Sequence, residues 1–158
     1  MNIASARPRA LAAMLVAATL GAAVAWPAPA AASANSASAK EVSVAILRGE
    51  NEPNTGGDPD AVGVALFGIN TDTGQICFLV AHVKVDGNIV AAHIHRAPAG
   101  VNGPVVVPFT APVEHITKGC VTAAPALATE IAANPRNFYY NIHSNLLPGG
   151  AIRGQLGP

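Results

Sequence analysis

The chain has 158 residues, with nine basic and nine acidic side chains, and only 11% of its residues are charged. This balance excludes the strongly basic surface with which proteins bind nucleic acids or anionic membranes. Hydrophobic residues make up 51% of the chain, which is enough to form the core of one domain.

The first 34 residues predict a secretory signal peptide. Arg7 and Arg9 precede an uncharged apolar run over residues 11–25. Such a run suits the hydrophobic region of a signal peptide and is shorter than the roughly 20 residues of a membrane span. Several small-residue sites could be cleaved after it, and we expect cleavage near Ala34. A retained N-terminal anchor is the alternative.

The remaining chain is expected to be an exported domain over residues 41–158, joined to the signal by a flexible linker at residues 35–40. The signal takes away two arginines and no acids, so the mature protein has seven basic and nine acidic residues. No second apolar run reaches spanning length. In an oxidising compartment, Cys77 and Cys120 are predicted to form a disulfide. A pair of free thiols that ligate a metal is the alternative.

Short β-prone segments separated by turn residues follow in chain order. Alternating apolar residues or apolar runs predict strands, and we expect them at residues 42–46, 61–69, 75–85, 89–95, 104–109, 138–143 and 151–156. One helix is expected between Thr122, a possible N-cap, and Asn134, which precedes a proline. The pattern predicts an all-β fold, an antiparallel β-sandwich with one short helix.

Three histidines form the candidate functional site. His93 and His95 are two residues apart on an expected strand, so their side chains point to the same face. His143 would join them if its strand is a neighbour. Three imidazoles suit copper(II) or zinc(II). The alternative is that these rings only hydrogen-bond the adjoining loops. His82 and His115 stand alone in the sequence and are expected to be surface residues.

Catalytic motifs are missing from the sequence. Ser144 follows His143, but no G-x-S-x-G pattern frames it, and no phosphate-binding loop is present. We therefore expect no enzymatic activity. A copper-dependent redox enzyme is the less favoured alternative.

Two separated motifs resemble the chordin-domain (CHRD) family, over roughly residues 42–156. The first is Ala92-His93-Ile94-His95-Arg96, followed by Ala99-Gly100-Val101-Asn102-Gly103-Pro104-Val105-Val106. The second is Tyr140-Asn141-Ile142-His143-Ser144, followed by Pro148-Gly149-Gly150-Ala151-Ile152-Arg153-Gly154-Gln155-Leu156. Cys77 and Cys120 also lie where many bacterial members of the family carry their cysteine pair.

The resemblance implies an immunoglobulin-like, Greek-key β-sandwich in a secreted bacterial protein. It also implies a binding or scaffold module without catalytic activity of its own, whose protein or surface partner is unknown. The alternative function is an extracytoplasmic protein that binds copper or zinc through His93, His95 and His143. Arg153 is expected to pair with a carboxylate or with backbone carbonyls. Many family members carry Glu where this chain has Ala151, so if that Glu orients Arg153 in the family, the pairing is absent here and another carboxylate is not evident in the sequence. The sequence does not define an oligomeric state.

Overall fold

The computed structural model describes residues 40–53, 56–109 and 115–158. The predicted signal peptide and almost all of the predicted linker lie outside the described residues. The described elements are β1 (Lys40–Arg48), the 3₁₀ helix η1 (Gly49–Asn51), β2 (Val62–Asn70), β3 (Gln75–Val83), β4 (Ile89–Arg96), β5 (Val105–Phe109), β6 (Ile116–Thr122), α1 (Pro125–Ala133), the 3₁₀ helix η2 (Pro135–Asn137), β7 (Phe138–Ser144) and β8 (Ile152–Gln155).

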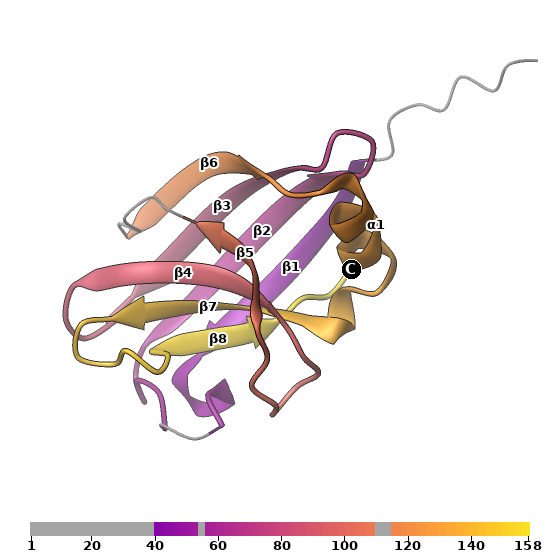
Figure 1. The fold of residues 1–158 in the computed structure, drawn as a ribbon. Coiled ribbons are helices and arrows are strands. Elements are labelled where there is room, and N and C mark those ends of the chain that lie inside the picture. The colour runs from indigo at the N-terminus through magenta and orange to yellow at the C-terminus, as the bar shows by residue number, and fades with distance from the viewer. Residues whose placement is uncertain (1–39, 54–55, 110–114) are drawn as a thin grey trace, which may run out of the picture. The chain divides into compact units, whose positions relative to one another are not determined.

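The strands form one antiparallel sheet in the order β5-β4-β7-β8-β1-β2-β3-β6. The sheet bends so that one half, β5, β4, β7 and β8, faces the other half, β1, β2, β3 and β6 (Figure 1). Aromatic rings from the two halves pack against each other. The ring centroids of Phe67 on β2 and Tyr140 on β7 are 5.3 Å apart, and those of Phe78 on β3 and Phe109 on β5 are 4.8 Å apart. The hydrophobic core therefore fills the space inside a nearly closed sheet.

The predicted all-β antiparallel fold is confirmed, but the immunoglobulin-like two-sheet arrangement is not what the structure shows. In an immunoglobulin-like sandwich the two sheets are separate, whereas here β1 pairs with both β2 and β8 and joins the halves. The pairing between β1 and β8 is short. Arg48 lies opposite Arg153, and an isolated β-bridge joins Val44 to Gly157. Glycine at position 154 allows the two strands to come this close. Any other residue would place a Cβ 2.2 Å from the carbonyl oxygen of Ile46.

Strand β6 (Ile116–Thr122) is the strand that the sequence pattern did not predict. Only Ile116 and Val121 are large and apolar in it, and Gly119 interrupts it. The strand forms because it pairs along β3, with Cys77 opposite Cys120. These two cysteines form the predicted disulfide, which fixes β6 as an edge strand.

Helix α1 closes one end of the sheet with Ala128 and Ile131 buried in the core. The expected N-cap was wrong: Thr122 ends β6, Ala124 is the N-cap, and Pro125 takes the first helical position, where its missing N–H has no cost. Asn134 follows the last helical residue, as predicted. No helix in the described part of the chain is long and apolar enough to cross a membrane.

The outer faces of the two halves differ in chemistry. Outside β1, β2, β3 and β6 the exposed side chains are mainly aliphatic, and they include Val42, Ile46, Val62, Leu66, Leu79, Val83 and Ile116. Outside β4, β7 and β8 the side chains are polar, and the loops after β4 and η1 cover several of them. The candidate site lies on this polar face.

Candidate metal centre

The pairing of β4 with β7 brings the three predicted histidines together. Ala92 and Ile94 of β4 are buried in the core, so His93 and His95 point to the outer face. On β7, Tyr140 and Ile142 are in the core, which leaves His143 on that same outer face. In the β4–β7 register, Ala91 lies opposite His143, so His143 is diagonal to His93.

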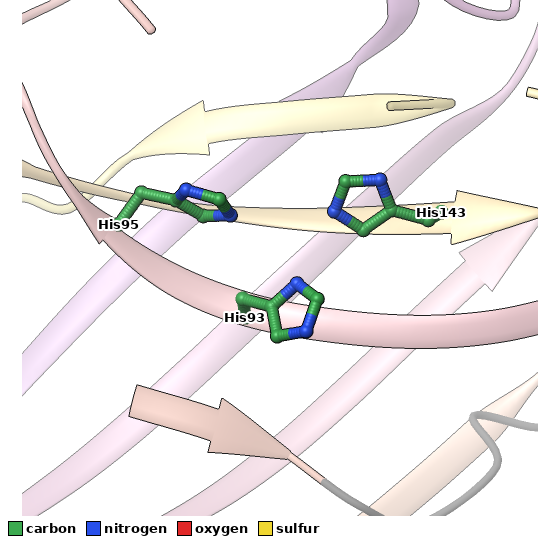
Figure 2. Close-up of side chains that lie close together, drawn as sticks. All are labelled: His93, His95 and His143. Atoms are coloured by element: carbon green, nitrogen blue, oxygen red, sulfur yellow. The ribbon is translucent and has the colours of Figure 1, made fainter. Parts of the chain in front are cut away.

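The three side chains offer one nitrogen each to a common point. The ligand atoms of His93, His95 and His143 all lie within 4.8 Å of one another. Figure 2 shows a nitrogen of each ring turned toward the space between the rings. Metal–nitrogen bonds of 2.0–2.1 Å require nitrogens roughly 3–4 Å apart, so nitrogens that all lie within 4.8 Å of one another are close to the spacing of a metal site.

Two backbone carbonyls fix which nitrogens are free to bind. His95 Nδ1 lies 2.8 Å from the carbonyl oxygen of Gly103, and His143 Nδ1 lies 3.0 Å from that of Pro148. A carbonyl only accepts, so in both rings Nδ1 carries the proton and Nε2 carries a lone pair. This is the arrangement by which proteins orient histidine ligands.

The nitrogens that face the common point have no hydrogen-bond partner. His93 Nδ1, His95 Nε2 and His143 Nε2 are all buried and unpaired among the described residues. A buried lone pair without a donor costs free energy. A bound cation would satisfy all three lone pairs, so the residues present fit a metal ion.

Burial and mutual repulsion keep the rings neutral. The pKa of His93 is lowered from its ordinary value of 6.5 by burial and then by His143 and His95. Burial also lowers the pKa of His95 and His143, although the Gly103 and Pro148 carbonyls partly oppose the effect. Neutral imidazole is the form that binds metals.

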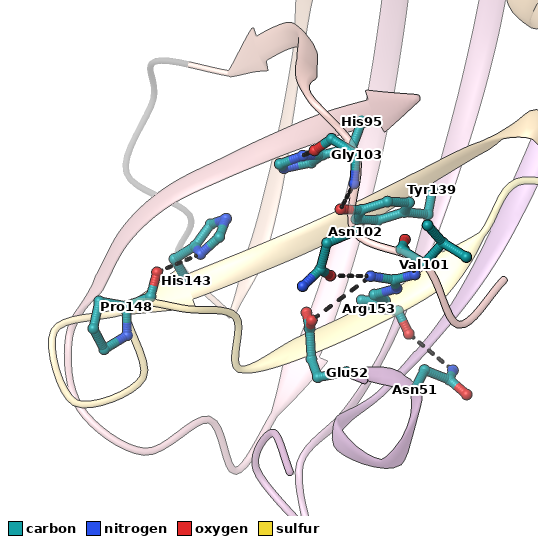
Figure 3. Close-up of polar contacts among 10 residues, drawn as sticks. All are labelled: Asn51, Glu52, His95, Val101, Asn102, Gly103, Tyr139, His143, Pro148 and Arg153. Atoms are coloured by element: carbon teal, nitrogen blue, oxygen red, sulfur yellow. Dashed lines mark hydrogen bonds and ion pairs between the residues drawn. The ribbon is translucent and has the colours of Figure 1, made fainter. Parts of the chain in front are cut away.

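A buried polar network supports the site from β7 and β8 (Figure 3). The guanidinium of Arg153 lies 3.7 Å from the centre of the Tyr139 ring and donates to Asn102 Oδ1 and to the carbonyl of Val101. Its Nη1 lies 4.0 Å from Glu52 Oε2, and both side chains are 2% exposed. Glu52 therefore supplies the carboxylate partner for Arg153 that was not evident in the sequence.

The other two histidines lie away from this cluster. His82 and His115 have ring centroids 5.5 Å apart. The expectation of a surface position was wrong for His82, which is 5% exposed, because it follows the core residues Ile76, Phe78 and Val80 on the inner face of β3.

Asn141 and Tyr139 lie on the same face of β7 as His143, because Tyr140 and Ile142 between them are in the core. Their alternation with core residues was the available signal. Glu52 gave no signal, because a single acidic residue in a polar loop looks like a solvated side chain.

A family model for the CHRD domain matches residues 43–156, which include all three histidines and both cysteines. The chain belongs to the CHRD-domain family. No match was found among curated proteins or among solved structures. The match establishes the family, and it leaves the role of the histidine cluster to be argued from its geometry.

Proposed function

We propose that this CHRD-domain protein is an exported, non-catalytic module that binds one copper(II) or zinc(II) ion through His93, His95 and His143. The observation that carries the proposal is the convergence of three buried, unpaired ring nitrogens within 4.8 Å. Two of the rings have their tautomer set by backbone carbonyls. Structural histidines would have no reason to leave three lone pairs facing one another.

Export is the part of the proposal that the N-terminal sequence supports. The charged start and apolar run of residues 1–34 have the form of a signal peptide. The disulfide of Cys77 and Cys120 suits an oxidising compartment. Copper(II) and zinc(II) are also the ions that imidazole ligands favour.

Calorimetric titration of the mature domain with each ion tests the proposal. We expect one-to-one binding that weakens more than about 100-fold in His93→Ala and in His143→Ala. His115→Ala is the matched control, since it removes an imidazole away from the cluster, and it should bind like the wild type. Absence of binding by the wild type, or unchanged binding in both cluster variants, would overturn the proposal.

A binding or scaffold role toward a protein or surface partner is the second candidate function. The observation that favours it is the exposed aliphatic face outside β1, β2, β3 and β6, because exposed apolar patches of this kind often mark interaction surfaces. The same titration separates the candidates, because a wild type that binds no metal leaves only the partner-binding role.

A further inference from the structure

We propose that Asn141 provides the fourth ligand of the metal centre through its side-chain oxygen Oδ1. This inference rests on the proposed function, and it completes the ligand set as three imidazole nitrogens and one amide oxygen.

Asn141 occupies the middle of the histidine cluster. It lies directly opposite His93 in the β4–β7 register and two residues before His143 on the same face of β7. Tyr139 is opposite His95, so Asn141 is also the diagonal neighbour of His95. One side chain thus adjoins all three histidines, without any change in the backbone.

The amide oxygen of Asn141 is buried and unpaired like the histidine nitrogens. The residue is 2% exposed, and Oδ1 has no hydrogen-bond partner among the described residues. The three histidines and Asn141 therefore contain four buried acceptor atoms that receive no hydrogen bond from the described residues. A water molecule has two protons and satisfies two such acceptors, whereas a four-coordinate cation satisfies all four.

The surroundings of Asn141 indicate which way its amide is turned. A hydrogen bond from Asn141 opposes the rise that burial causes in the pKa of Glu52, so the amide NH2 group is on the side of that carboxylate. His95 is the diagonal neighbour of Asn141 on the other side, and Oδ1 is the amide atom left without a hydrogen-bond partner among the described residues.

Glu52 and Arg153 hold Asn141 in this orientation. Arg153 is fixed by Asn102, by the carbonyl of Val101 and by the ring of Tyr139, and it lies beside Glu52. Glu52 in turn engages the amide NH2 group. Such outer partners orient ligands and tune their affinity.

A complete set of four protein ligands has a functional consequence. Catalytic zinc sites keep one position open for water or substrate, whereas closed four-coordinate sites are structural. With Asn141 as the fourth ligand, the centre holds its ion without an open position. The inference therefore deepens the proposed function, because it predicts metal retention and stabilisation of the fold.

The first test uses the wild-type mature domain and requires no mutation. Asparagine labelled with ¹³C and ¹⁵N in its side chain is incorporated, and the Asn141 amide signals are followed by NMR as zinc(II) is added. We expect its Cγ and NH2 signals to shift at one equivalent, together with the imidazole signals of the three histidines. The signals of Asn51, whose amide donates to the Arg153 carbonyl outside the cluster, serve as the internal control and should stay in place.

The second test compares zinc(II) affinities of variants. Asn141→Leu keeps the size of the side chain and removes the oxygen, so we expect affinity to fall about 10- to 100-fold. Asn51→Ala is the matched control and should leave affinity unchanged.

The outcomes separate this inference from the proposed function. If the wild type binds zinc, the histidine variants do not, and Asn141→Leu binds like the wild type with no shift of the Asn141 signals, then Asn141 is not a ligand and the three-histidine site stands. If the wild type binds no metal, both proposals fail. Absence of any shift of the Asn141 signals at one equivalent overturns the inference even if Asn141→Leu does not fold.

Discussion

His95 and Tyr139 stack face to face, with ring centroids 4.7 Å apart and ring planes 6° from parallel. They are register partners on β4 and β7. Gly103 contacts both, because its carbonyl accepts from His95 Nδ1 and its N–H donates to the Tyr139 hydroxyl at 3.3 Å. The ring of His95 is therefore held in its plane and tautomer before any metal binds.

The first prediction concerns this stack. Tyr139→Leu should weaken metal binding about tenfold, because His95 would no longer be held flat against an aromatic ring. Tyr139→Phe keeps the stack and loses only the bond to Gly103, so its affinity should stay close to that of the wild type. Calorimetry with zinc(II) measures both. Equal weakening in the two variants would show that the hydroxyl, and not the stacking, positions His95.

The second prediction concerns acid sensitivity of the metal-free domain. The fold lowers the pKa of His93, His95 and His143 below 6.5, so the unfolded chain binds more protons than the folded one in the window below that value. The free energy of unfolding should therefore fall as the pH drops from 6.5 toward the lowered pKa values, and be level above 6.5.

Urea unfolding with a chelator present, between about pH 7.5 and 5.5, measures this slope. Two charged side chains lie near the histidines. Arg153 adds to the lowering of the pKa of His95, and Glu52 lies beside Arg153. Burial raises the pKa of Glu52 above 4.5, so its contribution has the opposite sign: it is present below 4.5 and lost as the pH rises through the raised value. His143→Gln cannot take up a proton in this range and should show a shallower slope, and an unchanged slope would contradict the assignment.

The third prediction concerns the junction of the two halves of the sheet. Gly154→Ala should lower the free energy of unfolding by at least about 2 kcal/mol, because its Cβ would lie 2.2 Å from the Ile46 carbonyl oxygen and force β8 away from β1. Gly68→Ala is the matched control. A Cβ at Gly68 meets nothing within 4 Å, so its stability should be unchanged or higher by about 0.5–1 kcal/mol. Similar stabilities of the two variants would mean that β8 moves away without cost.

The fourth prediction concerns the disulfide. Cys77 and Cys120 are 43 residues apart, and loss of their bond should lower stability by about 4 kcal/mol in the chain-entropy model. The pair lies on the outer face, with Cys120 exposed, so Cys77→Ala with Cys120→Ala creates no core cavity. Urea unfolding of this double variant measures the effect. A loss of unfolding free energy well below 1 kcal/mol would contradict this value. It would show that the segments of β3 and β6 stay close together in the unfolded chain without the disulfide.

The local features of the site follow from the sequence. Because side chains on a strand alternate, His93 and His95 had to share a face, as did Asn141 and His143. The same alternation determined which aromatic residues enter the core. The oxidising compartment expected for the mature chain and its two cysteines were enough to predict the disulfide.

The sequence by itself thus determined the all-β class, most strands and the grouping of side chains on each face, because these depend on periodicity and turn residues within a few positions. Only the tertiary structure decided which strands are neighbours, and hence that His143 lies diagonal to His93. It also decided that β6 is a strand, that one sheet joins both halves, and that Glu52 supports Asn141. The physical reason is that these pairings join residues far apart in the chain, and their free energy comes from contacts that no local pattern records.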